Sequence, residues 1–167
     1  MTCYSILKTP LGDTLVTADA TQLIGLYFIE SAHPPERRAD WVLDARHPVL
    51  AQTGEQLYEY FNRERTSFSL PLHLSGTDFQ RRIWREIASI PFGETLSYSE
   101  LAQRAGAPRA IRAAGTSTGR NPICIIIPCH RVVGKHGALG GYAGGLERKR
   151  HLLALEHACI NAPVSKL

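Results

Sequence analysis

The sequence predicts an α+β fold in two parts, an amino-terminal unit built on strands and a carboxy-terminal unit dominated by helices. The first 30 residues alternate apolar and polar side chains around a Pro-Leu-Gly-Asp turn, which is typical of short antiparallel strands. After residue 75, closely spaced helical patterns with capping residues replace this alternation. We therefore place a domain boundary there and predict an α+β domain over residues 1–75 and a second domain over residues 76–167.

One helix is predicted in the amino-terminal unit after its first strands. Over residues 48 to 61 the apolar side chains fit one helical face, and they are Val49, Leu50, Leu57, Tyr58 and Phe61. Residues 68 to 72 then return to an extended pattern. Because nothing in this unit resembles a site, we expect it to act as a scaffold.

Three short helices are predicted at the start of the carboxy-terminal unit. The first is capped by Thr77 or Asp78 and ends at a Pro-Phe-Gly sequence. The second runs from a Ser-Tyr-Ser-Glu capping box to Ala105 and is followed by a glycine. Pro108 suits the first turn of the third, which should reach about Ser117. The last two form a helix-turn-helix candidate, although such pairs also occur in folds that bind nothing.

The predicted third helix has an unusual surface, because Arg109 and Arg112 lie three residues apart among alanines and a glycine. Small side chains would let this helix approach a duplex closely, and the narrow minor groove favours small residues with one arginine or an apolar wedge. The same small side chains would also allow tight packing in a core. DNA binding and core packing both remain open at this point.

Positive charge is concentrated in the second unit. Residues 1 to 75 hold six lysines and arginines against nine aspartates and glutamates, a balance of −3, whereas residues 76 to 157 hold twelve against six, a balance of +6. A positive surface favours a polyanionic partner, since neutralising phosphates releases condensed counterions. A solvated basic face without a partner would have the same composition.

We expect a cytoplasmic protein that neither spans nor acts at a membrane. No apolar run approaches the roughly 18 residues of a membrane span, and the first residues lack the features of a signal peptide. The four cysteines, Cys3, Cys124, Cys129 and Cys159, form neither a secreted disulfide framework nor a CxxC pair. The thiols should therefore stay reduced, and one of them could be reactive.

The segment IPCHRVVG holds the candidate nucleophile, Cys129. A free cysteine is only a few per cent thiolate near neutral pH, so nucleophilic use needs a base or positive charge, and His130 and Arg131 follow directly. The apolar run at residues 123 to 127 predicts a buried strand, and Cys129 and His130 can meet only if Pro128 starts a turn. On these residues alone a buried structural cysteine is the stronger interpretation.

Residues 121 to 156, NPICIIIPCHRVVGKHGALGGYAGGLERKRHLLALE, closely resemble the active-site region of the O6-alkylguanine-DNA alkyltransferases. The resemblance extends through residues 77 to 115 and weakly to TPLG at residues 9 to 12. Its PCHR core followed by a GYAGG-type loop is highly specific. The resemblance implies a ribonuclease-H-like amino-terminal scaffold and a helical, winged-helix-like DNA-binding domain that carries the thiol.

The resemblance also implies a reaction, in which Cys129 attacks the alkyl carbon on O6 of guanine in a single displacement, once per molecule. His130 would deprotonate Cys129 through a bridging water, and Glu156 would hold His130. Asn121 would tie the helix-turn-helix to the active-site strand. Tyr98 would rotate the 3′ phosphate of the target nucleotide and later donate a hydrogen bond to its base.

Contacts with DNA and with the flipped base follow from the same resemblance. Arg112 would enter the base stack and fill the space left by the extruded nucleotide, which would explain an arginine among small residues. The expected DNA contacts are Arg109, Arg112, Ala113, Tyr98 and Arg131, and the expected contacts of the base pocket are Tyr142, Ala143 and Val132.

The expected function is direct reversal of O6-methylguanine, and of O4-methylthymine, in double-stranded DNA, by a monomer that could bind DNA cooperatively. The alternative is a non-catalytic helix-turn-helix lesion sensor or regulator with a structural cysteine, since some relatives carry tryptophan at the acceptor position. A cysteine hydrolase would need an oxyanion site, for which the sequence has no clear candidate.

No cofactor and no metal are expected. Some relatives hold a structural zinc in the amino-terminal domain, but this half contains only Cys3 and the scattered histidines His33, His47 and His73.

Overall fold

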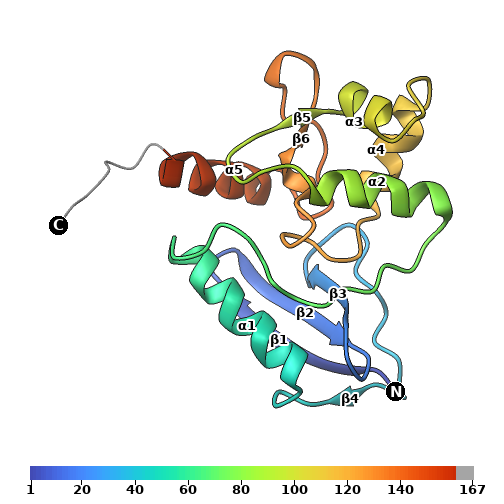
Figure 1. The fold of residues 1–167 in the computed structure, drawn as a ribbon. Helices are drawn as coiled ribbons and strands as arrows, with labels where there is room; N and C mark the ends of the chain where they lie inside the picture. The colour runs from blue at the N-terminus through green and yellow to red at the C-terminus, as the bar shows by residue number, and fades with distance from the viewer. Residues whose placement is uncertain (161–167) are drawn as a thin grey trace.

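The computed structural model describes residues 1–160, with side chains to residue 157. It has the predicted α+β composition, with the larger sheet and α1 in one half and the remaining helices in the other (Figure 1). The amino-terminal half is a sheet of strand order β3-β2-β1-β4, in which β4 pairs in parallel with β1 and the other pairs are antiparallel. The strands are β1 Cys3–Thr9, β2 Gly12–Ala18, β3 Leu23–Phe28 and β4 Val42–Leu43. The early strands predicted from alternation are confirmed, whereas the two-residue β4 was not predicted.

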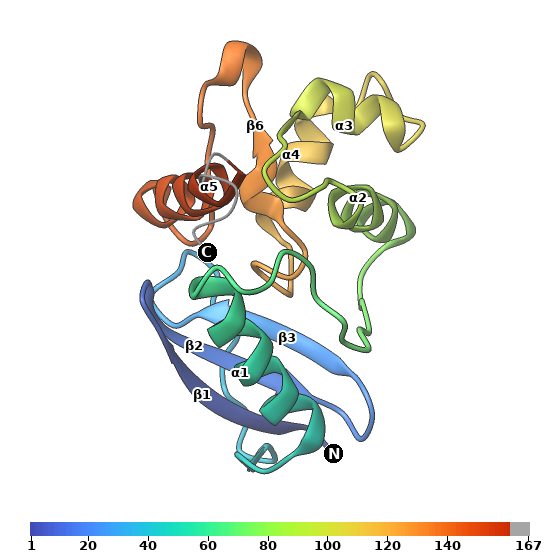
Figure 2. The same cartoon turned by 60° about the vertical axis from the view of Figure 1, so that its left-hand side comes forward.

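Helix α1, Pro48–Phe61, has the predicted bounds and packs across the sheet (Figure 2). Pro48 occupies its first turn, where no backbone donor is needed. The predicted inward face is wrong at one position, because Tyr58 is 69% exposed and Tyr60 is 1% exposed. Each residue advances the helix by about 100°, so Tyr60, three residues after the buried Leu57, returns to the core side.

Up to residue 160, the carboxy-terminal half contains four α-helices, two 3-10 turns and a two-stranded parallel sheet of β5 and β6. The elements are α2 Asp78–Ala88, β5 Leu96–Ser97, α3 Tyr98–Arg104, α4 Ile111–Gly119, η1 Cys129–Arg131, β6 Val132–Val133, η2 Lys135–Gly137 and α5 Leu146–Ile160. The predicted capping box between Ser97 and Glu100 is present, and Thr77, one of the two caps predicted for α2, forms a further capping box with Gln80. These caps start α2 and α3 at the expected residues.

The third predicted helix begins later than the sequence suggested. Pro108 and Arg109 lie in a turn, and α4 starts at Ile111 because Ala110 has φ −97° and ψ 42°, outside helical geometry. The prediction that Arg109 and Arg112 share a face of one helix is therefore wrong.

The predicted strand at residues 123 to 127 is buried as expected, but it is not a strand. Ile123 makes a single bridge to Leu26, and the chain then folds back on itself, with Ile127 N donating to the carbonyl of Ile123 at 3.0 Å. Ile125 adopts φ 70°, a strained conformation for a β-branched residue. Residues 123 to 127 are apolar because they pack in the hydrophobic core, and not because the segment is extended.

One continuous core joins the two halves. Leu26 of β3 donates through its backbone N–H to the carbonyl of Pro122 at 2.9 Å and accepts from Cys124 N at 3.0 Å. The sheet thus supports the segment that leads to Cys129, and buried side chains from both halves form a single cluster. The boundary near residue 75 stays a prediction. No helix in the described part of the chain is long and apolar enough to cross a membrane.

Candidate active site

Cys129 opens the 3-10 turn η1 directly after Pro128. Cys129 N donates to the carbonyl of Ile127 at 2.8 Å, and Arg131 N donates to that of Pro128 at 2.9 Å. This is the turn that the Cys-His sequence needed, since an extended chain would have sent the two side chains to opposite faces. Cys129 is 4% exposed and His130 is fully buried.

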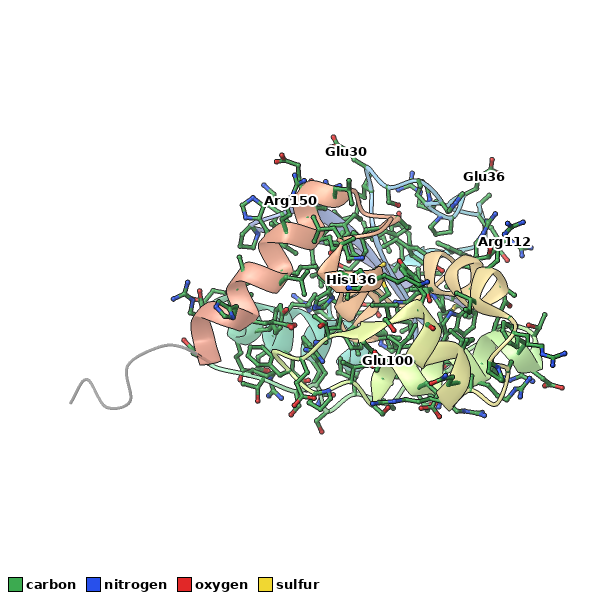
Figure 3. All side chains as sticks on the ribbon, turned by 90° about the horizontal axis from the view of Figure 1, so that it is seen from above. Glu30, Glu36, Glu100, Arg112, His136 and Arg150 are labelled. Carbon is green, nitrogen blue, oxygen red and sulfur yellow. The ribbon has the colours of Figure 1, made fainter. Side chains whose placement is uncertain are left out.

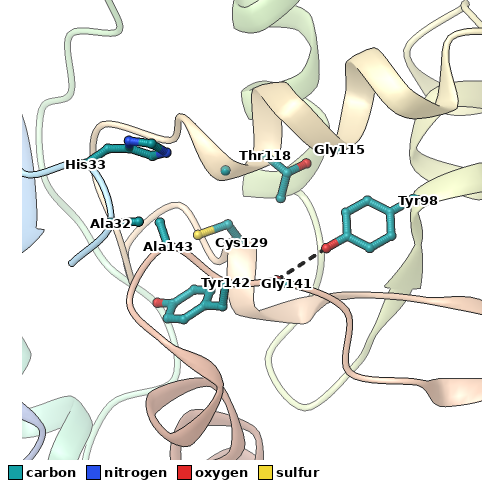
Figure 4. A pocket seen from close by; sticks show the side chains of 10 residues that line it. Ala32, His33, Tyr98, Gly115, Thr118, Cys129, Gly141, Tyr142 and Ala143 are labelled. Carbon is teal, nitrogen blue, oxygen red and sulfur yellow. Dashed lines mark hydrogen bonds between the residues drawn. The ribbon is translucent and has the colours of Figure 1, made fainter.

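The Cys129 side chain lies at the wall of a cavity of about 360 Å³, a size within the usual range for small-ligand sites (Figure 4). The walls come from the loop after β3, from the start of α3, from α4 and from the glycine-rich loop before α5. The residues that line the cavity include His33, Tyr98, Gly115, Cys129, Tyr142 and Ala143. Sequence reasoning missed His33 and its neighbour Ala32, whose N–H donates to the carbonyl of Ala143 at 2.8 Å.

Two glycines allow the aromatic walls of this cavity to close. Gly140 has φ +68°, and a Cβ there would lie 3.0 Å from Cε2 of Tyr98. At Gly144 a Cβ would lie 2.6 Å from Cε2 of Tyr142 and 3.0 Å from Cδ2 of Phe28. The Tyr98 hydroxyl also donates to the carbonyl of Gly141 at 3.4 Å. The glycine-rich loop therefore packs directly against the rings that shape the cavity.

The pKa of Cys129 lies below the ordinary value for a thiol. The largest cause is a hydrogen bond with the side chain of Cys124; burial acts in the opposite direction, and Asn121 and Lys149 lower the pKa further. The same contact raises the pKa of Cys124, so Cys124 remains the thiol that donates and Cys129 is the better thiolate. Neither Cys124 nor Lys149 was singled out from the sequence.

Replacing Cys124 with alanine is therefore expected to raise the pKa of Cys129. Loss of the donor should slow the reaction of Cys129 with iodoacetamide near pH 7 by about two- to tenfold, with the rates converging at high pH. Peptide mass spectrometry over a pH series measures this for Cys129 alone. Cys3→Ala is the matched control, because Cys3 is equally buried but lies in β1. An unchanged pH dependence in Cys124→Ala would show that the contact does not matter.

Lys149 places a buried ammonium group beside the site. Its Nζ donates to the carbonyl of Val132 at 2.6 Å and to that of Gly141 at 3.2 Å, and burial lowers the pKa of Lys149 to about 8. In the sequence Lys149 looks like one member of a solvated basic run. The sequence nevertheless indicates that Lys149 faces the core. Lys149, Leu152 and Glu156 are spaced i, i+3 and i+7, so Lys149 shares one helix face with the apolar Leu152.

Glu156 is the centre of a buried hydrogen-bond network. Its Oε1 accepts from His130 Nε2 at 2.7 Å, Tyr60 Oη at 2.8 Å and Arg131 Nη2 at 2.8 Å. Its Oε2 accepts from Arg131 Nε at 3.0 Å and from Gly93 N at 3.3 Å. Burial disfavours the carboxylate, but the bonds from His130 and Arg131 outweigh it and lower the pKa of Glu156 to about 2. Glu156 is therefore ionised.

His130 is held as a neutral imidazole. Burial lowers the pKa of His130, and this outweighs the opposite effect of Glu156. With an ionised carboxylate at 2.7 Å, Nε2 carries the proton and donates it to Glu156. Nδ1 is buried and has no hydrogen-bond partner among the described residues. Nδ1 is thus the nitrogen that can accept a proton.

Asn121 holds the turn that precedes Cys129. Its Nδ2 donates to the carbonyl of Ile127 at 2.7 Å, and its Oδ1 accepts from Ile123 N at 2.9 Å. The Asn121 side chain therefore clamps both ends of the buried segment, and it also reaches the thiol of Cys129. Asn121 therefore contacts Cys129, and the neighbouring His130 contacts Glu156 through a separate hydrogen bond.

Two family models match the chain over nearly its full described length. Residues 2–74 match the 6-O-methylguanine DNA methyltransferase ribonuclease-like domain, and residues 78–158 match the DNA binding domain of the same family. The chain belongs to this methyltransferase family. The ribonuclease-like amino-terminal half and the DNA-binding carboxy-terminal half expected from the resemblance are those of the family.

Curated relatives and solved structures agree with this assignment. The chain is 44% identical to the methylated-DNA-protein-cysteine methyltransferase of Mycolicibacterium paratuberculosis over 92% of this chain and 91% of that protein. It is 40% identical to the constitutive enzyme of Bacillus subtilis over 93% and 96%. The crystal structure of Mycobacterium tuberculosis OGT in complex with DNA matches with a TM-score of 0.88 at 43% identity, over 94% of each chain.

In this family member, the predicted DNA contacts on α4 are exposed beside the cavity. Arg112 lies on the solvent side of the helix (Figure 3). Ala113 is also exposed, and so is Arg109 in the turn before the helix. Arg112 and the cavity residues Gly115 and Gly119 are spaced i, i+3 and i+7 and so share a helix face. An arginine thus lies on the helix face that also borders the thiol cavity.

Two predicted contacts of the methyltransferase do not fit the structure. Arg131 is 6% exposed, and its guanidinium binds Glu156 and the carbonyl of Ile90, so its prediction as a DNA contact is wrong. Val132 is fully buried in β6, and its side chain does not line the cavity in the described part of the chain. Its carbonyl accepts from Lys149 instead.

Among residues 1–157, no three histidine, cysteine or acidic side chains are placed to hold a metal ion. The scattered residues of the amino-terminal half do not converge: Cys3 is buried in β1, His47 accepts a hydrogen bond from Val49 N at the start of α1, and His33 lines the cavity. The absence of a structural zinc stays a prediction.

Proposed function

We propose that this chain repairs O6-methylguanine in double-stranded DNA by moving the methyl group to its own Cys129, irreversibly and once per molecule. The observation that carries the proposal is the buried, activated thiol of Cys129 at the wall of a cavity in the DNA-binding half. Curated relatives at 40% to 44% identity are methylated-DNA-protein-cysteine methyltransferases. Repair by alkyl transfer to cysteine is therefore the activity of the family.

The site supports a simple displacement. His130 Nδ1 takes the proton of Cys129 through a bridging water, and Glu156 stabilises the resulting imidazolium through Nε2. The thiolate attacks the methyl carbon, an S–C bond forms, the C–O6 bond breaks, and the electron pair stays on the purine, which then takes up a proton. Water does not displace the cysteine thiolate from the methyl carbon of a thioether, so the protein is not regenerated.

The target base must leave the duplex to reach Cys129. Unstacking costs a few kcal/mol, and a planar guanidinium inserted in the stack replaces part of the lost contact. Arg112 is exposed on the helix face beside the cavity, which suits it to this role. Tyr98 lies at the start of α3 and in the cavity wall, which supports a role in contacting the backbone and base of the same nucleotide. Tyr142 and Ala143 line the pocket for the base.

The partner is DNA, in keeping with the DNA-binding domain of the family and the DNA complex of the Mycobacterium tuberculosis relative. The proposal also includes alkylated bases as the target and reaction with O4-methylthymine. It further includes a monomeric state with cooperative DNA binding and a cytoplasmic location. The alternative of a lesion sensor with a structural cysteine has no observation in its favour, since three neighbouring groups act to lower the pKa of Cys129.

The proposal is tested by incubating the protein with a duplex that contains one O6-methylguanine and weighing the peptide that bears Cys129. A gain of one methylene mass, stoichiometric with the protein and accompanied by restored guanine, is expected. Cys129→Ala and an unmethylated duplex serve as controls. An unmodified Cys129 peptide beside an intact lesion would overturn the proposal and favour the sensor.

A further inference from the structure

The amino-terminal half reaches into the centre of the active-site network through one side chain. Tyr60, in the last turn of α1, is 1% exposed, and its hydroxyl donates to Glu156 Oε1 at 2.8 Å. This is the same oxygen that accepts from His130 Nε2 at 2.7 Å. The bond spans 96 positions in the sequence and joins the two domains at the carboxylate that holds the base.

The Tyr60 ring is held in place by packing against three other aromatic rings. It contacts Phe61 edge-on with centroids 5.3 Å apart, Phe68 at 5.4 Å and Phe92 at 6.2 Å. Phe92 in turn lies under the guanidinium of Arg131, which is 5.6 Å from its ring centroid. The aromatic cluster that fixes the Tyr60 hydroxyl therefore also contacts the guanidinium of Arg131, which binds Glu156.

Glu156 Oε1 receives more donors than it has lone pairs. A carboxylate oxygen offers about two lone-pair sites, and Oε1 accepts from His130, Tyr60 and Arg131. The donors must share its electron density. The Tyr60 hydroxyl thus sets both the orientation of the carboxylate and the strength of its bond to His130.

We propose that Tyr60 is a positioning residue for alkyl transfer, which fixes Glu156 and limits how strongly Glu156 holds the proton-accepting ring of His130. The inference rests on the proposed function, since that function makes His130 the base. Tyr60 is not among the residues that line the thiol cavity in the described structure. It acts through Glu156.

The charges around His130 predict the direction in which its titration midpoint moves when the Tyr60 hydroxyl is lost. Glu156 and Lys149 face it from α5 and Arg131 from its own turn, while Tyr60 faces Glu156 from α1. Loss of the Tyr60 hydroxyl leaves Glu156 with one donor fewer, so its bond to His130 strengthens and the imidazolium is favoured. The titration midpoint of His130 should move upward, and the rate of alkyl transfer should begin to fall at a higher pH on acidification.

The test uses the full chain with Tyr60→Phe, which removes only the hydroxyl, and Tyr58→Phe as the matched control on the exposed side of the same helix. Histidine labelled with nitrogen-15 reports the His130 titration by NMR. We expect the midpoint to rise by about half a pH unit in Tyr60→Phe and to stay in place in Tyr58→Phe. The acid side of the pH-rate profile for methyl transfer should move with it.

A second substitution checks the sign without removing the hydroxyl. A 3-fluorotyrosine at position 60 is a stronger donor, so it should move the His130 midpoint downward. A Tyr60 hydroxyl that only completes the core would change thermal stability and leave both midpoints at the wild-type value, and that result would overturn the inference. Wild-type protein that fails to accept methyl groups from DNA would instead contradict the proposed function, while the NMR titration would still report on Tyr60.

Discussion

Replacing Glu156 with glutamine is expected to lower the free energy of unfolding by about 3–5 kcal/mol and to slow alkyl transfer by about 100-fold or more. The variant leaves the guanidinium of Arg131 buried without its counter-charge, which accounts for the stability loss. It also presents His130 Nε2 with a neutral amide instead of a carboxylate, so the imidazolium formed on proton transfer is less stabilised. Urea unfolding and single-turnover kinetics measure the two effects.

Glu147→Gln is the matched control, because Glu147 lies exposed on the same helix. It should change the free energy of unfolding by less than about 0.5 kcal/mol and leave the rate intact. Equal stability of Glu156→Gln and wild type would mean that the buried network does not hold the two domains together.

The same glutamine variant should have a different acid stability profile. The folded-state pKa of Glu156, about 2, lies below its ordinary value of 4.5, so its contribution is present above about pH 4.5 and is lost as the pH falls towards about 2. The stability gap between wild type and Glu156→Gln should therefore narrow on acidification across this window. Urea unfolding at a series of acidic pH values checks this, and a constant gap would contradict the lowered pKa.

Replacing Arg112 with alanine should slow repair of duplex DNA by about 10- to 100-fold, because extrusion of the base costs a few kcal/mol and the guanidinium offsets part of it. The rate with a free O6-alkylguanine base should not change, since that substrate needs no extrusion. Single-turnover assays with both substrates separate these effects.

Arg120→Ala is the charge-matched control for Arg112. Arg120 is exposed at the other end of α4, so its loss removes one positive charge without removing the side chain beside the cavity. It should weaken DNA binding modestly and make the affinity for DNA less dependent on salt concentration. The rate of transfer should be normal once DNA is bound. Equal losses on the duplex and on the free base in Arg112→Ala would contradict a role in base extrusion.

In the amino-terminal half, the sequence predicted the secondary structure but not the residues that contribute to the site. Its pattern predicted strands and the helix at residues 48 to 61, and both are present. It offered no candidate site, yet Tyr60 binds the carboxylate that holds His130, and Ala32 and His33 line the cavity. Single residues of ordinary type carry no local signal, because their importance depends on partners far away in the sequence, such as Glu156 for Tyr60, 96 positions away.

The carboxy-terminal helices were predictable because their signals are local. The N-cap of α2 and the capping box of α3 act over three or four residues, and both are present in the structure. The late start of α4 and the folded-back segment before Cys129 were not predictable in this way. A positive φ at Ile125 is held by the surrounding core and by Asn121, and an apolar run alone does not distinguish a buried strand from a buried turn.

By itself the sequence determined the α+β composition and most helix bounds, and it predicted the candidate nucleophile and, through its resemblance to a family, the residues proposed to serve it. Only the tertiary structure decided which groups set the chemistry of Cys129 and His130: the thiol of Cys124, the ammonium of Lys149, and the shared oxygen of Glu156. Helix caps and amphipathic stripes act between neighbours in the chain, whereas a pKa depends on burial and on charges brought together by folding.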